Sequence, residues 1–213
     1  MPRMNRKFLK HWVGSISRQM AVVLCYVSLV LTHSCDRKDT ESGGEKSLSQ
    51  RSGLPVIKDA PSFEGVDQNG KRCTSDRLNG SIWIASFMFS SCQGVCPVMN
   101  STIRDLQRLD GEKDLRFVSF TVDPEHDTPE VLRSYGKEYS ADSTRWFFVH
   151  MPIDSVRRLS VQGFLLSDPV EPSAHSSRYA LIDKQQRIRG YYDCLDSAKV
   201  HELREAVRAL RRE

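Results

Sequence analysis

Two cysteines four positions apart carry the clearest chemical signal in this chain. They lie in the segment Cys92-Gln-Gly-Val-Cys96-Pro97, which follows the mostly apolar run Ser81–Phe89. On a helical turn, residues four apart have Cβ atoms about 5–6 Å apart. With a modest adjustment of rotamer or backbone, both sulfurs then reach one metal ion, or each other as a disulfide. The spacing therefore predicts a metal-binding or redox-active pair.

The position of this pair, between an expected strand and an expected helix, favours chemistry over a structural role. A helix that begins near Cys96, with Pro97 in its first turn, directs its positive end at both sulfurs. Such a helix end lowers the pKa of a thiol and favours the thiolate, which binds metals and attacks disulfides. Gly94 loosens the turn between the two cysteines. The alternative is a structural pair, such as a stabilising disulfide in an exported protein.

Two thiolates are too few for a closed structural zinc site, which takes four ligands, so another donor is expected elsewhere in the chain. The chain has six histidines. His126 follows an Asp-Pro turn, His150 follows an expected strand, and His175 lies in the loop 167–177. The others lie in the leader or in the final helix. The residues alone do not choose among His126, His150 and His175.

The elements that must position these residues can be predicted from the pattern of apolar side chains. Ser81–Phe89 and Leu115–Val122 are rich in β-forming residues, which predicts two central strands. Apolar residues at i, i+4 and i+7 predict a helix after Pro97. Thr128 as N-cap and Pro129 at the first helical position open the next helix.

The remaining elements alternate in type along the chain. Gln68-Asn69-Gly70 predicts a β-hairpin near the start of the domain. Further on, the pattern predicts a short strand at Trp146–Val149, a helix at Ile153–Val161, a hairpin of Tyr179–Asp183 with Arg187–Tyr192, and a final helix with Val200, Leu203, Val207 and Leu210 on one face. This order indicates an α/β domain in which helices flank a mixed sheet.

Residues 1–35 have the pattern of an export signal. Basic residues precede the apolar run Met20–Thr32, which is shorter than the roughly 20 residues of a membrane-spanning helix. Cys35 follows the small residue Ser34, as in a bacterial lipoprotein signal, and is the candidate for lipidation. An uncleaved anchor and a buried core helix are the alternatives. Because positive charge stays inside, the rest of the chain is expected outside the cytoplasm, anchored to the membrane by its N-terminus.

Charge and composition divide the rest of the chain. Residues 36–53 are polar and rich in Gly and Ser, which predicts a flexible linker, and a single folded domain is expected over residues 54–213. The net charge is +4, but the leader holds five cations and no carboxylate, which leaves 26 cations against 27 carboxylates. A folded part without a basic surplus loses the main electrostatic argument for binding nucleic acid.

Three motifs follow one another along the chain: Cys92-x-x-x-Cys96-Pro97, then Val118-Ser-Phe-Thr-Val-Asp123-Pro124 with Asp127-Thr128-Pro129-Glu130, and then His175-Ser176 before a Tyr-Ala-Leu-Ile-Asp strand. In this order they resemble the Sco/SenC family of thioredoxin-like copper chaperones for cytochrome c oxidase assembly. The resemblance covers roughly Leu54–Arg212 and includes Arg189-Gly-Tyr-Tyr-Asp193 near its end. It implies a thioredoxin-like fold with a mixed central sheet, flanking helices and an N-terminal β-hairpin.

The resemblance also implies a ligand set. In the family the two motif cysteines and the loop histidine bind one copper ion, Cu(I) or Cu(II), which here implies Cys92, Cys96 and His175. The same comparison places Asp123 near the copper. Thiolates favour Cu(I), whereas imidazole suits both oxidation states. Cys194 departs from the family pattern, and Cys73 and Cys194 are expected to be small buried or solvated side chains.

Two classes of function follow from these residues. The first is a membrane-tethered metallochaperone that takes copper from an upstream donor and delivers it to the copper-bearing subunit of cytochrome c oxidase. The second is a thiol–disulfide oxidoreductase that keeps the copper-site cysteines of the oxidase reduced, with Cys92 attacking and Cys96 resolving. Redox thioredoxins place two residues between their cysteines rather than three, and an oxidoreductase leaves His175 without a role, so the first class is favoured. A peroxide-reducing thiol enzyme, with Ser90 and Arg104 near one cysteine, has weaker support.

Overall fold

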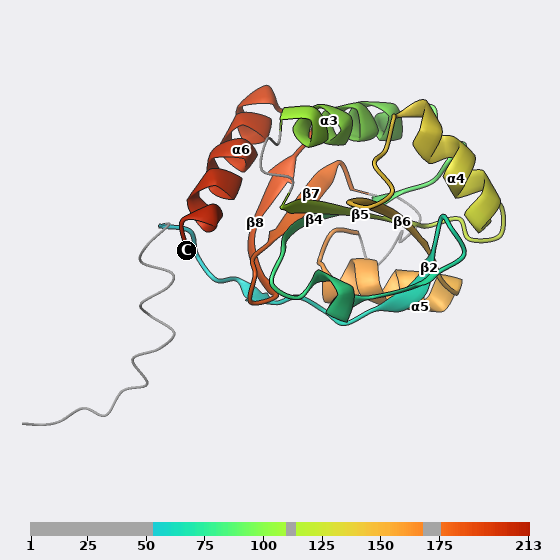
Figure 1. The fold of residues 1–213 in the computed structure, drawn as a ribbon, viewed down its shortest axis with the longest axis horizontal. Coiled ribbons are helices and arrows are strands. Elements are labelled where there is room, and N and C mark those ends of the chain that lie inside the picture. The colour runs from blue at the N-terminus through green and yellow to red at the C-terminus, as the bar shows by residue number, and fades with distance from the viewer. Residues whose placement is uncertain (1–52, 110–113, 168–175) are drawn as a thin grey trace, which may run out of the picture. The chain divides into compact units, whose positions relative to one another are not determined.

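One mixed sheet organises the part of the chain that the structure describes. The computed structural model describes residues 53–109, 114–167 and 176–213. Within them, eight strands form a sheet in the order β1-β8-β7-β4-β5-β6-β2-β3 (Figure 1). The predicted leader (residues 1–35), nearly all of the linker (36–53) and His175 lie outside these ranges.

The strands and helices alternate largely as the sequence predicts. The strands are β1 Lys58–Asp59, β2 Glu64–Asp67, β3 Arg72–Thr74, β4 Ile82–Met88, β5 Leu115–Thr121, β6 Trp146–His150, β7 Arg178–Ile182 and β8 Arg187–Asp193. The helices are α3 Val95–Leu109, α4 Pro129–Glu138, α5 Ile153–Arg158 and α6 Ser197–Arg211. In none of the described ranges is there a helix with the length and apolarity needed to cross a membrane.

The directions of the central strands bring several connections to one edge of the sheet. β4 runs parallel to β5, and β5 runs parallel to β6, so all three have their carboxyl ends at the same edge. β7 pairs antiparallel with β4, which places its first residues at that edge as well. In open α/β sheets, ligands bind beyond the carboxyl ends of parallel strands.

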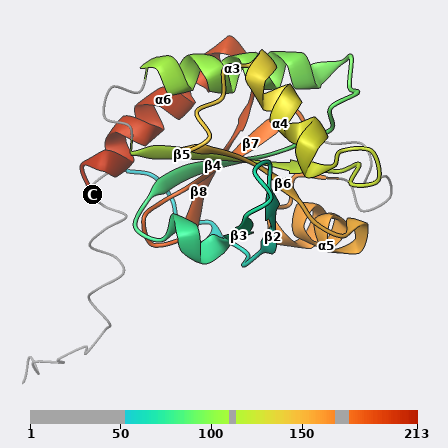
Figure 2. The same ribbon diagram turned by 45° about the vertical axis from the view of Figure 1, so that its right-hand side comes forward.

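The two faces of β4 pack against different helices, because successive side chains of a strand point to opposite faces. Ile82, Ile84 and Met88 belong to one core cluster, which includes side chains of α3, α4 and α6. Trp83, Ala85 and Phe87 belong to a second cluster, which includes side chains of α5. Figures 1 and 2 show α3, α4 and α6 above the sheet and α5 below it. All seven residues of β4 are buried, as a strand covered on both faces requires.

The predicted hairpin near the start of the domain is confirmed, and it extends the sheet. Gly70 turns the chain with φ +74°, and its N–H donates to the carbonyl of Asp67 at 2.9 Å. β2 also pairs antiparallel with β6, with Val66 opposite His150. This long-range pairing could not be predicted from local pattern.

The helix predicted at Ile153–Val161 ends earlier than expected. α5 stops at Arg158, and Leu159–Gly163 continue as a π-helical turn. At the end of that turn, a side chain on Gly163 would place its Cβ 2.9 Å from Cγ of Pro61. The close approach of the segment before β2 therefore explains why a glycine ends this turn.

A buried arginine joins the start and the end of the folded part. The side chain of Arg189 on β8 is fully buried and pairs with Asp183 at 2.8 Å and with Glu213 at 2.7 Å. Its guanidinium also donates to the carbonyls of Leu54 at 2.8 Å and Pro55 at 3.0 Å. A buried charge of this kind is stable only when such partners surround it.

Replacement of Arg189 by methionine is expected to lower the free energy of unfolding by about 3–5 kcal/mol, because the buried carboxylate of Glu213 loses this cation and that of Asp183 is left with its second pair, to Arg187 at 2.9 Å. Urea unfolding followed by circular dichroism measures the change. The control is Arg72→Met, whose pair with Glu64 is mostly exposed, so that solvent screens it and its loss is expected to cost far less than that of Arg189. Equal losses of unfolding free energy in the two variants would contradict the view that buried Arg189 joins the start and the end of the folded part.

Candidate metal centre

The cysteine turn connects β4 to α3 at the edge where the parallel strands end. The N–H of Cys92 donates to the carbonyl of Phe89 at 3.3 Å, which begins the turn directly after β4. The N–H of Val122 donates to the carbonyl of Met88 at 2.9 Å, so the connection after β5 is tied to the same point. The predicted strand–turn–helix setting of Cys92 and Cys96 is therefore present, and α3 begins at Val95.

Cys92 is the sulfur that meets the N-terminus of α3. Burial alone raises the pKa of its thiol, but four hydrogen bonds outweigh that effect and lower the pKa below its ordinary value. The donors are the backbone N–H groups of Cys96, Gly94 and Val95 and the thiol of Cys96. Because Cys92 is half-buried, its thiolate is favoured at a position that solvent and ligands reach.

Cys96 lies in the opposite environment. Its side chain is fully buried in the cluster beneath α3. Burial raises its pKa to about 12, only partly offset by a hydrogen bond from the N–H of Phe89, and the sulfur of Cys92 and the carboxylate of Asp127 raise it further. Cys96 therefore keeps its proton, and its thiol donates a hydrogen bond to the sulfur of Cys92. The sequence predicted that the positive end of the helix faces both sulfurs and lowers the pKa of a thiol there; this holds for Cys92, whereas for Cys96 burial outweighs it.

Gly94 leaves space beside the sulfur of Cys92 and does not adopt a backbone conformation that requires glycine. Its φ lies outside the left-handed region, so the turn does not need glycine for its conformation. A Cβ at this position would lie 3.9 Å from Sγ of Cys92, an ordinary van der Waals contact. The glycine thus leaves the sulfur more accessible while its N–H donates to that sulfur.

Asp123 follows β5 at the same edge, and its carboxylate contacts His126. Nδ1 of His126 lies 2.8 and 2.9 Å from the two carboxylate oxygens, and this hydrogen bond with its charge raises the pKa of the imidazole. The side chain of His126 is 77% exposed. A role for Asp123 beside a metal stays a prediction.

Asp127 is the carboxylate that contacts the cysteine turn, and the sequence analysis assigned it no role. It is 1% exposed and accepts hydrogen bonds from the N–H of Ser90 at 3.0 Å, from the hydroxyl of Ser90 and from the hydroxyl of Thr121. Its position four residues after Asp123 was visible in the sequence. Nothing local distinguishes the two, because Ser90 follows β4 and Thr121 ends β5, so both partners are set by the fold.

Among the described residues, none completes a three-donor metal site with the sulfurs of Cys92 and Cys96. Nε2 of His150 lies 3.1 Å from the carbonyl of Pro124, and His175 lies outside the described ranges. In residues 53–109, 114–167 and 176–213, no three His, Cys, Asp or Glu side chains converge on a point that would hold a metal ion. Of the expected metal donors, the described residues therefore include the two sulfurs of Cys92 and Cys96.

Ser90 and Arg104 do not form the arrangement that a peroxide-reducing enzyme needs. The Ser90 hydroxyl is bound to Asp127. Nε of Arg104 donates to its neighbour Asp105 at 3.1 Å. Cys73 and Cys194 are buried in the two different core clusters, and burial raises the pKa of each to about 11. The expectation that they are small buried side chains is confirmed, and they lie on opposite faces of the sheet.

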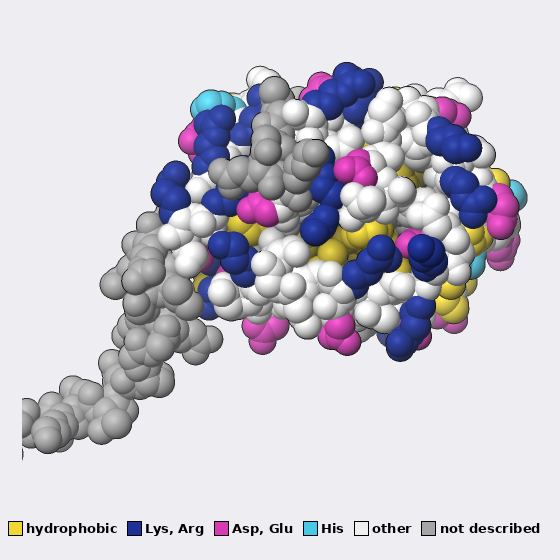
Figure 3. Space-filling model, in the orientation of Figure 1, with side chains coloured by type: hydrophobic (Ala, Val, Ile, Leu, Met, Phe, Trp, Pro, Cys, Tyr) yellow, Lys and Arg dark blue, Asp and Glu magenta, His cyan; other side chains and the backbone are white. Residues whose placement is uncertain are grey.

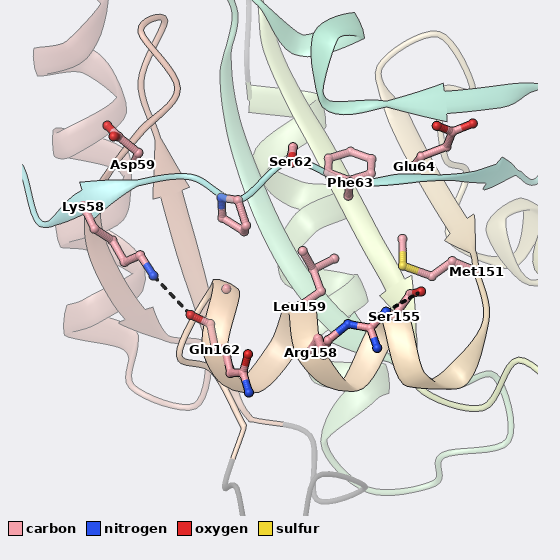
Figure 4. Close-up of a pocket in the computed structure, with 12 residues that line it drawn as sticks. Lys58, Asp59, Ser62, Phe63, Glu64, Met151, Ser155, Arg158, Leu159 and Gln162 are labelled. Atoms are coloured by element: carbon pink, nitrogen blue, oxygen red, sulfur yellow. Dashed lines mark hydrogen bonds between the residues drawn. The ribbon is translucent and has the colours of Figure 1, made fainter.

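Two cavities differ in their relation to the cysteine turn. One, of about 510 Å³, lies between residues 58–64 and α5, where Lys58, Phe63, Met151 and Leu159 surround it (Figure 4). The other, of about 410 Å³, is lined by Ser90, beside the cysteine turn, and by a face of α4 that includes Tyr135 and Glu138. On the surface drawn in Figure 3, basic and acidic side chains are interspersed.

Comparison with known proteins identifies the relatives of this chain. The family model described as SCO1/SenC matches residues 56–210. A SCO2-like protein of Rickettsia prowazekii is 39% identical over 166 residues, which cover 69% of this chain and 76% of the relative. A SCO1 protein homolog of Bacillus subtilis is 35% identical over 97 residues, 45% of this chain. The chain spans half the length of that second relative.

Solved structures share the fold. A SCO1/SenC family lipoprotein from Bacillus anthracis superposes with a TM-score of 0.67 at 28% identity, covering 74% of this chain and 97% of its own. BsSco, a member of the Sco family of cytochrome c oxidase assembly proteins, gives 0.63 at 25% identity, with 75% and 97% covered. Bradyrhizobium japonicum ScoI, solved with copper bound, gives 0.56 at 21% identity, with 72% and 98% covered. The thioredoxin-like fold expected from the sequence is confirmed.

The two motif cysteines are expected to differ in reactivity, because the pKa of Cys92 is lowered and that of Cys96 is raised to about 12. In the metal-free, reduced chain near neutral pH, iodoacetamide should modify Cys92 at least about tenfold faster than Cys96. Peptide mass spectrometry at timed intervals measures both rates. In guanidinium chloride the difference should disappear, since it depends on the fold. Equal rates in the folded chain would contradict the assignment.

Proposed function

The chain belongs to the SCO1/SenC family, and we propose that it binds copper and takes part in the assembly of cytochrome c oxidase. The observation that carries this proposal is the sulfur pair of Cys92 and Cys96 in one turn, where hydrogen bonds at the start of α3 lower the pKa of Cys92 and favour its thiolate. Thiolates are soft donors that select Cu(I). The kinship with BsSco, named as a cytochrome c oxidase assembly protein, supports the same role.

The unequal environments of the two sulfurs suit a protein that takes up and releases its cargo. Cys92 is half-buried and meets an incoming ion first, whereas Cys96 is buried and protonated. Binding of copper by both sulfurs requires Cys96 to lose its proton, and release of copper returns one. Copper uptake should therefore be coupled to proton release at neutral pH.

We propose His175 as the third ligand and Asp123 as a neighbour of the copper. The family resemblance of the His175-Ser176 motif supports the first assignment, and the Asp123-Pro124 motif supports the second. His175 lies three residues before Arg178, where β7 begins at the edge that carries the cysteine turn. An imidazole added to two thiolates lets one site hold either oxidation state of copper. The copper-bearing subunit of the oxidase is the proposed recipient, and an upstream donor supplies the ion.

A thiol–disulfide oxidoreductase is the second candidate, and the difference in pKa between the two cysteines favours it. The thiolate of Cys92 would attack a disulfide in the partner, and the Cys96 thiol would resolve the mixed disulfide. The partner then gains two electrons and two protons, and this chain is left with the Cys92–Cys96 disulfide. Both roles use the same turn, and the histidine separates them, because thiol exchange needs only the two sulfurs.

For the N-terminus we propose export, cleavage of the leader and lipid attachment at Cys35, which would anchor the domain outside the cytoplasm. The short apolar run Met20–Thr32 supports this, as does kinship with a SCO1/SenC family lipoprotein. Mass spectrometry of protein extracted from membranes should find a modified Cys35 as the first residue. An intact peptide that begins at Met1 or Pro2 would establish an uncleaved anchor instead.

The variant His175→Ala tests the ligand set and separates the two candidate functions. It should abolish the sulfur-to-Cu(II) charge-transfer absorption and weaken Cu(II) binding at least about tenfold, roughly 1.4 kcal/mol, because the harder ion loses its nitrogen ligand. The Cys92–Cys96 disulfide should still form. Absorption titration with Cu(II) measures the affinity.

His126→Ala and His150→Ala are the matched controls for this variant, since their imidazoles contact Asp123 and the carbonyl of Pro124. Both should keep the affinity of the unmodified chain. Loss of Cu(II) binding in either control, with full binding in His175→Ala, would overturn the assignment. If no histidine mattered and disulfide exchange alone supported oxidase assembly, the oxidoreductase would be the function.

A further inference from the structure

A buried carboxylate at the cysteine turn calls for a physical reason. Asp127 is 1% exposed, and removing a carboxylate from water costs several kcal/mol unless hydrogen bonds replace the lost hydration. Here the N–H and hydroxyl of Ser90 and the hydroxyl of Thr121 supply those bonds. The site is therefore built around the carboxylate, although Asp127 lies outside the motif residues assigned to copper.

These bonds join three segments that are far apart in the sequence. Ser90 lies two residues after the end of β4 and two residues before Cys92, while Thr121 is the last residue of β5. Asp127 itself precedes the N-cap of α4. Its own backbone is held as well, since its N–H donates to the carbonyl of Asp123 at 2.9 Å. The carboxylate thus ties Ser90, at the start of the connection between β4 and α3, to the loop between β5 and α4.

We propose that Asp127 is a positioning residue that holds Ser90 and thereby sets the direction of the Cys92 sulfur toward the N-terminus of α3 and toward Cys96. This deepens the proposed function, because it concerns the same sulfur pair. Ser90 is held by backbone and hydroxyl at once, so it can neither shift nor rotate without losing a bond. The next anchor of the turn is the bond from the N–H of Cys92 to Phe89.

The proximity of the carboxylate to the sulfurs supports this role. Burial raises the pKa of Cys96 most, and the charge of Asp127 adds to the increase. If Asp127 only stabilised the N-terminus of α4, its hydrogen bonds to Ser90 would have no function. The hydroxyl of Thr121 binds the same carboxylate from β5, outside the cysteine turn. A change at Thr121 therefore shows what loss of a hydrogen bond to Asp127 does when Ser90 stays in place.

Closure of the Cys92–Cys96 disulfide in the metal-free full chain tests the proposal. Diamide is the oxidant, and it takes up the two electrons and two protons that the two thiols release. Asp127→Asn and Ser90→Ala should each slow closure about tenfold, because the sulfurs lose their fixed geometry. Quenching with acid at timed intervals, followed by peptide mass spectrometry, measures the rate.

Two matched variants separate positioning from stability. Thr121→Val should lower the urea midpoint of unfolding but change the closure rate by less than about twofold. Ser90→Thr keeps the hydroxyl, and its extra methyl group has room because Ser90 lines a cavity of about 410 Å³, so it should restore the rate. If Asp127→Asn does not fold, the comparison of Ser90→Ala, Ser90→Thr and Thr121→Val carries the test.

Three outcomes would overturn the proposal: a rate unchanged in both Asp127→Asn and Ser90→Ala, a rate slowed equally in Thr121→Val, or no restoration by Ser90→Thr. The measurement uses no copper. A chain that closes its disulfide as expected but takes up no copper would therefore contradict the proposed function and leave the role of Asp127 intact.

Discussion

The hydrogen bonds from the N-terminus of α3 to the sulfur of Cys92 are the interaction on which the site depends. They exist because β4, buried on both faces, ends at Met88, and the cysteine turn leads from it to α3, which begins at Val95 and whose first N–H groups have no partners within the helix. A sulfur placed there gains donors that favour the thiolate. Metal binding and disulfide exchange both begin from that thiolate.

The rest of the fold holds this contact in place. Parallel β4 and β5 end together, so the loop after β5 lies beside the cysteine turn and brings Asp127 to Ser90. The side chain of Cys96 lies in the core beneath α3, where burial raises its pKa to about 12, whereas Cys92 is only half-buried. One turn therefore holds two sulfurs that differ in protonation. The thiolate of Cys92 is favoured, whereas Cys96 loses its proton only when it binds a metal or forms a disulfide.

The sequence predicted the local features of this arrangement and missed those that depend on distant contacts. The apolar run before Cys92, the Thr128 N-cap and the Gly70 turn each have a local cause, and the structure confirms all three. The contrast between Cys92 and Cys96 depends on which sulfur faces the core. The burial of Asp127 depends on the hydroxyl of Ser90, which follows β4, and on that of Thr121 in β5, so no local pattern distinguished it from Asp123.

Metal analysis of the purified chain after loading with copper, combined with titration of its thiols, tests whether Cys92 and Cys96 bind copper together. We expect about one copper ion per chain, with both cysteines protected from the thiol reagent and protons released on uptake. Copper bound while both cysteines remain reactive, or no copper retained by the reduced chain, would contradict this expectation.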